Sequence, residues 1–125
     1  MANILIIDDD DDVRNYLMRL VAMFHYTPFC ADNCESGRKL MAQTEPRMNV
    51  IISDVYLPDG PAEAVKWVVE LKSKAKGRPL IIISGAASDD LVAEIEGSKE
   101  VMATLTKPFE LVFIEELLKR ATAAK

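Results

Sequence analysis

The chain has 125 residues, of which 50% are hydrophobic, and a formal net charge of −5 at pH 7. This length is enough for one domain with its own hydrophobic core, so we predict a single domain over residues 1–125. The negative charge disfavours a nucleic-acid backbone or an anionic membrane as a partner, because both attract basic surfaces.

The first residues, the two cysteines and the single histidine indicate where the protein works and which chemistry it lacks. No apolar segment approaches the length of a membrane span, and residues 1–3 lead directly into an apolar run without room for a signal peptide, so we expect a cytoplasmic protein. Cys30 and Cys34 are the only cysteines and form neither a zinc-ligand pattern nor a disulfide framework, which predicts free thiols. His25 is the only histidine and falls at the end of a predicted helix, which disfavours histidine-based catalysis.

Short apolar runs and amphipathic stretches alternate five times along the chain. The apolar runs predict strands buried on both faces of a parallel sheet, and the amphipathic stretches predict helices that cover it. The pattern therefore indicates an α/β fold with a doubly wound, five-stranded parallel sheet and helices on both faces. The predicted strands are 4–7, 27–31, 50–52 running into Ser53 and Asp54, 80–83 and 101–106. The predicted helices are 13–24, one from about 34 that stops before Pro46, one from Pro61 to 71, one through 91–95 that closes at Gly97, and one through 111–118.

A run of basic residues joins the third predicted helix to the fourth predicted strand. Lys72, Lys74, Lys76 and Arg78 surround Gly77 in this run. Charge runs of this kind are usually solvated, so we predict an exposed loop rather than a binding patch.

Five consecutive aspartates, Asp8 to Asp12, follow the first apolar run. The last three, Asp10 to Asp12, fall where a helix begins, and there acidic side chains cap free N–H groups and favourably face the helix dipole. Asp8 and Asp9 lie at the tip of the strand, where two neighbouring carboxylates repel each other unless a cation or a raised pKa relieves them. We therefore assign capping to the last three aspartates and chemistry to the first two.

Polar residues end four of the predicted strands: Asp8 with Asp9, Asp54, Ser84 and Lys107. In an open parallel sheet the carboxyl ends of the strands share one edge, which is where ligands bind. Three carboxylates and one ammonium leave a surplus of negative charge, and a divalent cation that prefers oxygen ligands would relieve it. We predict Mg²⁺ at this edge, with a phosphoryl group completing its coordination.

Four motifs lie at the ends of predicted strands: Ile4-Leu5-Ile6-Ile7-Asp8-Asp9-Asp10, Asp54 with Pro58 four residues later, Ser84-Gly85, and Thr106-Lys107-Pro108-Phe109. In these motifs, and over nearly all its length, the chain resembles the receiver domain of bacterial two-component response regulators. The resemblance implies a flavodoxin-like (βα)5 fold.

The resemblance implies a role for each carboxylate. Asp54 would accept a phosphoryl group from a phosphohistidine on a sensor histidine kinase or a histidine phosphotransfer protein. Mg²⁺ would be held by Asp8, Asp9 and Asp54 together with the backbone carbonyl of Tyr56. The domain would promote its own phosphorylation and dephosphorylation without being a conventional enzyme.

The resemblance also implies the remaining phosphoryl contacts and the output. Lys107 would pair with one phosphoryl oxygen, the Ser84 hydroxyl would bond another, and the Lys107–Pro108 peptide would be cis. The domain would bind a downstream protein target or self-associate through its fourth helix, fifth strand and fifth helix, without contacting nucleic acid. On the final helix, Val112 and Phe113 are predicted to face away from the buried side and to contribute to this surface.

Some positions depart from the pattern of the family, and two other functions fit part of the sequence. Pro61 and Ala62 replace a common Asp and Gly in the loop after the third strand, and Thr104 stands where an aromatic residue is common.

The segment Asp8-x-Asp10 after an apolar strand also resembles the nucleophile loop of haloacid-dehalogenase-type phosphohydrolases, in which Asp8 would be the nucleophile and Asp10 would be the general acid. A third alternative is a degenerate receiver that binds partners without being phosphorylated.

Overall fold

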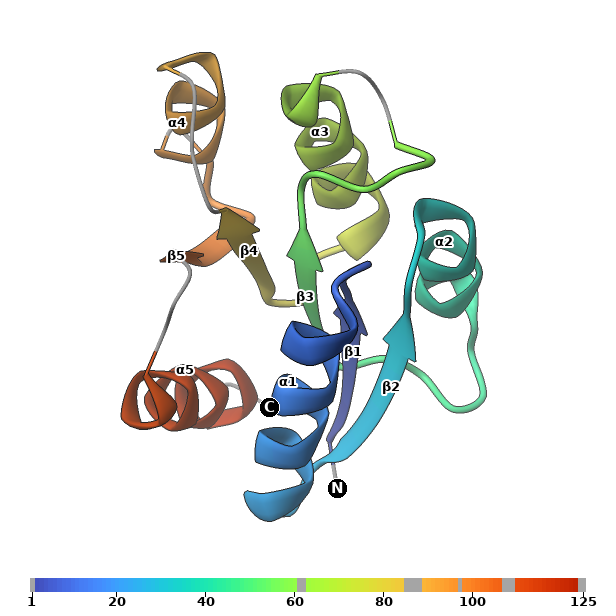
Figure 1. The fold of residues 1–125 in the computed structure, drawn as a ribbon, viewed down its shortest axis with the longest axis vertical. Helices are drawn as coiled ribbons and strands as arrows, with labels where there is room; N and C mark the ends of the chain where they lie inside the picture. Colours follow the sequence, from blue (N-terminus) through green and yellow to red (C-terminus); the bar gives the residue numbers. More distant parts are fainter. Residues whose placement is uncertain (1, 61–62, 85–88, 97, 107–109, 124–125) are drawn as a thin grey trace.

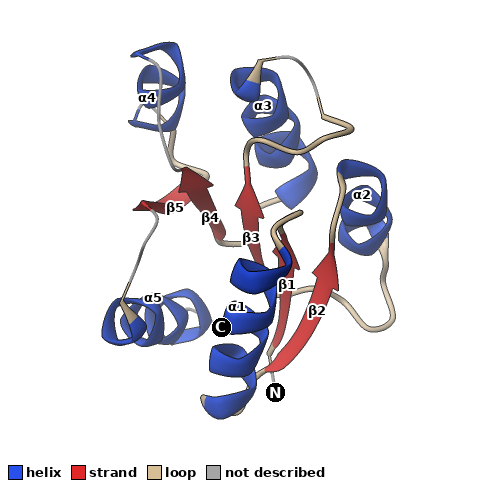
Figure 2. Cartoon of the chain, in the orientation of Figure 1, coloured by secondary structure: helices blue, strands red, loops and turns tan. Residues whose placement is uncertain are grey.

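Five strands and five helices alternate along the chain in the computed structural model, which describes residues 2–60, 63–84, 89–96, 98–106 and 110–123 (Figures 1 and 2). The strands are β1 (Asn3–Ile7), β2 (Thr27–Ala31), β3 (Val50–Asp54), β4 (Leu80–Ser84) and β5 (Val101–Thr106). The helices are α1 (Asp11–Met23), α2 (Cys34–Ala42), α3 (Ala64–Ala75), α4 (Asp89–Glu96) and α5 (Leu111–Ala123). The predicted alternation is confirmed, while Pro61 and Gly97, predicted as helix boundaries, lie outside the described residues.

All five strands are parallel and form one sheet in the order β2-β1-β3-β4-β5. Strand β1 lies between β2 and β3, so that Ile7 pairs with Ala31 on one side and with Ser53 on the other. The strand order therefore reverses at β1 and β3, whose carboxyl ends are neighbours. This is the doubly wound parallel sheet that the sequence predicts.

Helices cover both faces of the sheet, and this explains why the strands are apolar without alternation. Ile4 and Ile6 pack with α1 and α5, whereas Leu5 and Ile7 pack with α2, α3 and α4 (Figure 1). Successive side chains of a strand point to opposite faces, so a strand covered on both sides turns neither face to solvent. All four side chains are fully buried.

The prediction of a solvated loop over the basic run holds for Lys76, which lies in an exposed turn after α3, but is wrong for the other three basic residues. Lys72 and Lys74 lie in the last turns of α3, and Lys72 pairs with Glu94 of α4. Arg78 is only 5% exposed, and its guanidinium donates to backbone carbonyls at the ends of two helices. The charge pattern of the run carries no information on where a long arginine side chain can reach, which is why sequence reasoning missed this contact.

The two cysteines and the single histidine lie as the sequence predicts. Cys30 and Cys34 are free, as predicted, with Cys34 buried and Cys30 exposed. His25 is exposed and follows the C-cap residue of α1 in a left-handed conformation, with a φ of 69°. Among the helices that the structure describes, none is both long and apolar enough to cross a membrane.

Candidate functional site

The structure brings Asp8, Asp9 and Asp54 together at the carboxyl edge of the sheet. Ile7 of β1 pairs with Ser53 of β3, so the next residues along the two strands, Asp8 and Asp54, come side by side. One carboxylate oxygen from each of the three aspartates lies within 4.8 Å of the other two. Asp8 and Asp54 are buried and Asp9 is exposed, so the cluster is open to solvent on one side. Three hard oxygen donors at this spacing fit a Mg²⁺ ion that also keeps water ligands.

Backbone hydrogen bonds hold the turn that carries the first of these aspartates. The amide of Asp8 donates to the carbonyl of Ala31 at 3.0 Å, and the Asp8 carboxylate accepts from the amide of Asp10 at 2.9 Å. Arg14 from the first turns of α1 donates to the Asp8 carbonyl at 2.8 Å. The side chain of Asp8 is therefore oriented by its own turn and by the neighbouring strand.

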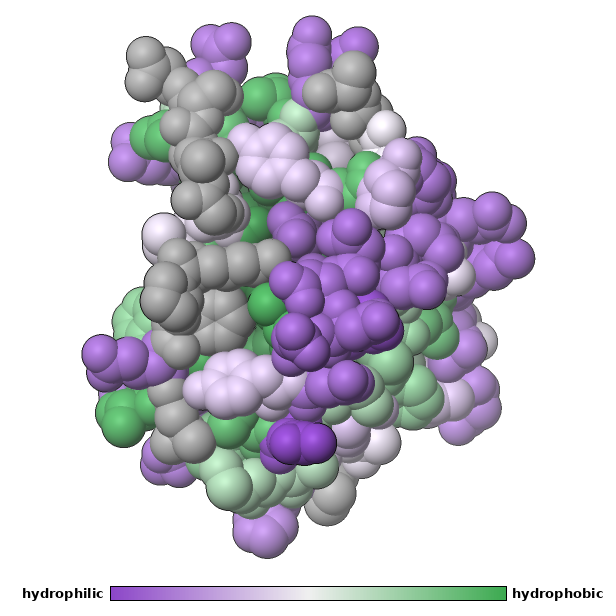
Figure 3. Space-filling view, viewed as in Figure 1, coloured by the Kyte–Doolittle hydropathy of each residue, from purple (hydrophilic) through white to green (hydrophobic). Residues whose placement is uncertain are grey.

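The next aspartates cap α1 as predicted. Asp10 is the N-cap residue, and its carboxylate accepts from the amides of Asp12 at 2.9 Å and Val13 at 3.3 Å. Asp11 lies in the first turn and pairs with Arg14. Figure 3 shows the hydrophilic surface that gathers where β1 leads into α1. The five aspartates thus divide between helix capping and the carboxylate cluster.

The backbone at Asp54 is fixed by a buried polar chain. The Ser53 hydroxyl donates to the carbonyl of Asp54 at 2.7 Å, and the indole N–H of Trp67 donates to the Ser53 hydroxyl oxygen at 3.0 Å. Trp67 is fully buried on α3. On the far side of Asp54, the amide of Tyr56 donates to the Asp54 carboxylate at 3.1 Å, and the Tyr56 side chain is half exposed.

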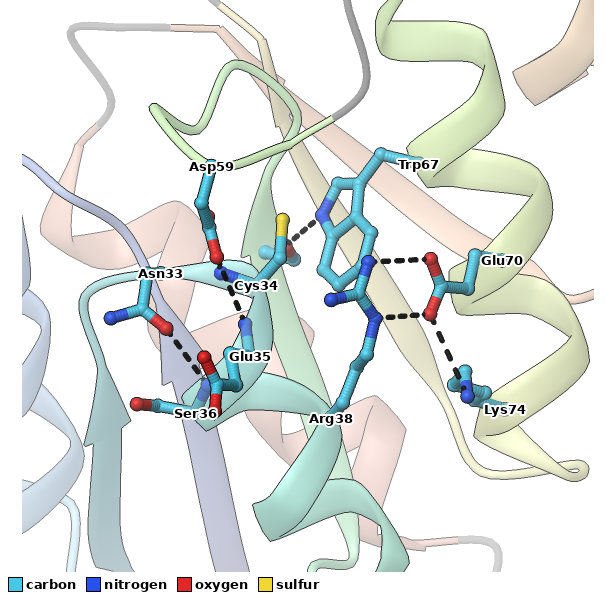
Figure 4. A network of polar contacts seen from close by, with 10 residues as sticks. Asn33, Cys34, Glu35, Ser36, Arg38, Asp59, Trp67, Glu70 and Lys74 are labelled. Atoms are coloured by element: carbon cyan, nitrogen blue, oxygen red, sulfur yellow. Dashed lines mark hydrogen bonds and ion pairs between the residues drawn. The ribbon is translucent and has the colours of Figure 1, made fainter.

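The loop after β3 is tied to α2 by Asp59 (Figure 4). The Asp59 carboxylate accepts from the amides of Cys34 at 2.8 Å and Glu35 at 3.1 Å, the first two residues of α2. The hydrogen bond from the Cys34 amide is the main reason why the pKa of Asp59 lies below its usual value. Burial, followed by the charge of Asp59, raises the pKa of the Cys34 thiol to about 12, so this thiol stays protonated at neutral pH. Asp59 lies in the turn Leu57-Pro58-Asp59-Gly60, and its contact with α2 cannot be read from the sequence.

A second contact links α2 to α3 beside Trp67, the residue that donates to Ser53 (Figure 4). The Arg38 guanidinium donates to the Glu70 carboxylate from two nitrogens, at 2.5 and 3.0 Å, and lies 5.3 Å from the centre of the Trp67 ring. The hydrogen bond with Arg38 is the main cause of the lowered pKa of Glu70. Lys74 adds a longer ion pair to Glu70 at 3.6 Å. The Arg38–Glu70 pair thus packs against the Trp67 ring that donates to Ser53. The sequence pattern does not reveal this contact.

Ser84 lies at the same edge of the sheet as the carboxylates. It ends β4, which pairs with β3 so that Ile83 lies opposite Asp54. Ser84 is 4% exposed, and its hydroxyl has no hydrogen-bond partner among the described residues. A buried hydroxyl without a partner costs free energy, so Ser84 is a candidate for a ligand contact at this edge. Lys107 and the Lys107–Pro108 peptide lie outside the described residues, and Thr104 is exposed on β5.

The strand order and the position of the carboxylates define a class of protein. A parallel sheet of order 2-1-3-4-5 with a cluster of ligand atoms at the β1/β3 reversal is a flavodoxin-like α/β domain, in which ligands bind at this point. The family model of the response regulator receiver domain matches residues 4–120, so the chain belongs to this family. It is a receiver domain of two-component signalling, a family in which Mg²⁺ binding and phosphoryl transfer are general properties.

Known proteins and structures agree with this assignment. The chain is 28% identical over 123 residues to the regulatory protein AtoC of Escherichia coli (strain K12), covering 94% of this chain and 24% of that protein. The chain thus spans about a quarter of the length of this curated relative. Chemotaxis protein CheY4 of Vibrio cholerae matches with a TM-score of 0.73 and 28% identity over 97% of this chain and 98% of that chain. The signal receiver domain of an HD domain-containing protein from Pseudomonas fluorescens Pf-5 shares the fold with a TM-score of 0.83, at 20% identity over 98% of this chain and 88% of that chain.

Proposed function

We propose that Asp54 is the phosphoacceptor of this receiver domain. The carboxylate cluster of Asp8, Asp9 and Asp54 is the observation that carries the proposal. Within this cluster, Asp54 is the carboxylate on the central strand β3, whereas Asp8 and Asp9 follow β1. The membership of the chain in the receiver family favours this role over a phosphohydrolase in which Asp8 would be the nucleophile.

Asp8, Asp9 and Asp54 would hold Mg²⁺, together with the backbone carbonyl of Tyr56. The bound ion would supply positive charge that neutralises the phosphoryl oxygens and lowers their repulsion of the attacking carboxylate. The buried position of Asp8 supports a fixed ligand, and the exposed position of Asp9 supports a ligand that can exchange with water.

The transfer step joins a carboxylate oxygen of Asp54 to phosphorus. The oxygen attacks in line, the bond between phosphorus and the histidine nitrogen of the donor breaks, and its electron pair returns to that nitrogen. Ser84 would donate its hydroxyl hydrogen to a phosphoryl oxygen, which gives a partner to a hydroxyl that has none among the described side chains. Lys107 would pair with another phosphoryl oxygen. The chain mainly positions groups, which is most of what this chemistry needs.

We further propose that residues 1–125 form a single receiver domain that works in the cytoplasm, where free thiols such as Cys30 and Cys34 are usual. The phosphodonor would be a sensor histidine kinase or a histidine phosphotransfer protein. The output surface would include α4, β5 and α5, on which Val112 and Phe113 are 66% and 48% exposed. A downstream protein or a second copy of the chain would bind there.

Mass spectrometry after incubation with acetyl phosphate and Mg²⁺ tests the phosphoacceptor. The wild-type chain should gain one phosphoryl group, and Asp54→Ala should gain none. Asp32→Asn is a matched control, because Asp32 is an exposed aspartate that directly follows β2 at the same edge. A phosphoryl group on Asp54→Ala at the wild-type level, or one mapped to Asp8, would refute the proposal. The absence of labelling on the wild-type chain would instead favour a degenerate receiver.

A further inference from the structure

A cavity of about 260 Å³ lies between the C-terminal ends of α2 and α3. It borders the segments that lead into β3 and β4, so it lies toward the amino ends of these strands, whereas Asp54 lies at a carboxyl end. Its lining includes five basic side chains and no acidic one: Arg38, Arg47, Lys74, Lys76 and Arg78. A basic cavity of this kind in a chain of net charge −5 is not explained by phosphoryl transfer at Asp54.

Two of the basic side chains share one carboxylate. Arg38 binds Glu70 through two nitrogens, and Lys74 lies 3.6 Å from the same carboxylate (Figure 4). Glu70 has one negative charge and faces two positive ones. These two residues therefore leave a surplus of positive charge at the rim of the cavity.

Arg78 is buried without a carboxylate partner among the residues that the structure describes. Its guanidinium donates to the carbonyls of Ala75 at 2.7 Å, Lys74 at 2.8 Å, Met41 at 3.0 Å and Met48 at 3.3 Å. Burial, followed by the charge of Arg47, lowers the pKa of Arg78 from its usual value. The carbonyls satisfy its hydrogen bonds, but only the partial negative charges of the helix ends offset its charge.

Arg47 and Lys76 are exposed, and the described residues give neither of them an ion pair. The two helix ends contribute about half a negative charge each, and Glu70 contributes one. The cavity therefore keeps a surplus of about three positive charges. No other group in the described lining reduces this surplus.

We propose that this cavity binds the phosphate groups of a small phosphorylated metabolite. The guanidinium of Arg38 is bound to Glu70 and that of Arg78 to backbone carbonyls, so these two supply positive charge. The exposed Arg47 and Lys76 would donate to the phosphate oxygens, which the planar N–H groups of a guanidinium match well. A phosphate ester concentrates about two negative charges in a small volume. The cavity is slightly smaller than the roughly 300 Å³ at which sites for drug-sized ligands begin, so it suits a small molecule and not a large cofactor. A monocarboxylate would leave most of the positive charge without a partner.

Isothermal titration calorimetry with inorganic pyrophosphate tests the proposal. The titration uses buffer without Mg²⁺ at constant ionic strength, so that neither metal chelation nor general screening accounts for the heat. The test variant is Arg47→Gln/Lys76→Gln, which removes two exposed charges from the lining. The control variant is Arg19→Gln/Lys66→Gln, which removes two exposed charges from α1 and from the beginning of α3, outside the lining.

We expect saturable binding to the wild-type chain and to the control, and binding about tenfold weaker or more in the test variant, equivalent to about 1.4 kcal/mol at 25 °C. Pyrophosphate should also raise the melting temperature of the wild type and of the control by more than that of the test variant. Equal weakening in both variants, or no saturable binding by the folded wild type, would refute the site. Citrate binding as tight as that of pyrophosphate would refute phosphate as the ligand class. Because the titration contains neither Mg²⁺ nor a phosphodonor, none of these outcomes depends on the role of Asp54.

Discussion

The two ends of the sheet carry side chains of opposite charge. At the carboxyl edge, Asp8, Asp9 and Asp54 bring negative charge together, and the buried hydroxyl of Ser84 has no partner among the described residues. Toward the amino ends of β3 and β4, basic side chains surround a cavity, and the buried charge of Arg78 has its donors satisfied by carbonyls. The net charge of −5 describes neither end, because it sums a negative surplus at one end and a positive surplus at the other.

The comparison also separates structural from functional polar groups. The hydrogen bonds of Arg78 are made within the protein, so this residue stabilises the ends of α2 and α3. At the carboxyl edge, the Ser84 hydroxyl is buried without a partner among the described residues, and three carboxylates lie close enough together to bind a metal ion. Substitutions should therefore affect stability at Arg78 and ligand binding at the carboxylates.

Arg78→Met should cause the largest loss of stability at the basic end. Methionine keeps most of the apolar stem but leaves buried carbonyls without their donor, so the free energy of unfolding should fall by about 3 kcal/mol. Urea unfolding measures the change. Lys76→Gln, an exposed neighbour, is the control and should change the value by about 0.5 kcal/mol or less. Equal losses in the two variants would show that Arg78 is not a structural anchor.

Asp9→Ala should weaken Mg²⁺ binding at the acidic end by about a hundredfold, because it removes a charged ligand and not merely a supporting group. Calorimetry with MgCl₂ measures this change without relying on Trp67, which is buried on α3. Arg47→Gln/Lys76→Gln should bind Mg²⁺ as the wild type does, since charges beyond about 10 Å are largely screened at 0.1 M salt. Unchanged affinity in Asp9→Ala would contradict its role as a ligand.

Trp67→Phe should have a smaller effect on stability, through the buried hydrogen bonds from Trp67 to Ser53 and from Ser53 to Asp54. Phenylalanine keeps an aromatic ring beneath Arg38 but cannot donate to the Ser53 hydroxyl, so stability should fall by about 1–2 kcal/mol. Chemical denaturation measures this loss, with Val69→Ala on the exposed side of α3 as the control. Stability equal to that of the wild type would show that the indole hydrogen bond contributes little.

The smallest expected effect is the acid dependence of the Arg38–Glu70 pair. The pKa of Glu70 is lowered in the folded chain, so its contribution to stability is complete above the unfolded pKa of about 4.3 and is lost as the pH falls through the folded value. The difference in unfolding free energy between wild type and Glu70→Gln should therefore be constant above about pH 5 and shrink below it. With Arg38→Gln as the background, most of this pH dependence should disappear. A difference that grows on acidification would contradict the sign of the shift.

Much of the fold could be predicted from local patterns. The unbroken run Ile4 to Ile7 indicates a strand covered on both faces, and the confirmed bounds of β2 and β5 coincide with the predicted ranges. Exposure of Val112 and Phe113 also follows from helical periodicity and is confirmed. The convergence of Asp8 with Asp54 could be expected, because carboxyl ends of parallel strands share one edge.

The contacts that hold these elements in place required the tertiary structure. Asp59 caps α2 from a loop 25 residues further along the chain, and Arg78 reaches the carbonyl of Met41 across 37 residues. Neither contact leaves a periodic signal, because each depends on how far a side chain extends once the helices have packed. The sequence by itself determined the order of the strands and helices along the chain and the acids at the strand ends, since these follow from local polarity and spacing. Only the tertiary structure decided which charges are neutralised and which face a cavity, because that depends on distances between elements remote in sequence.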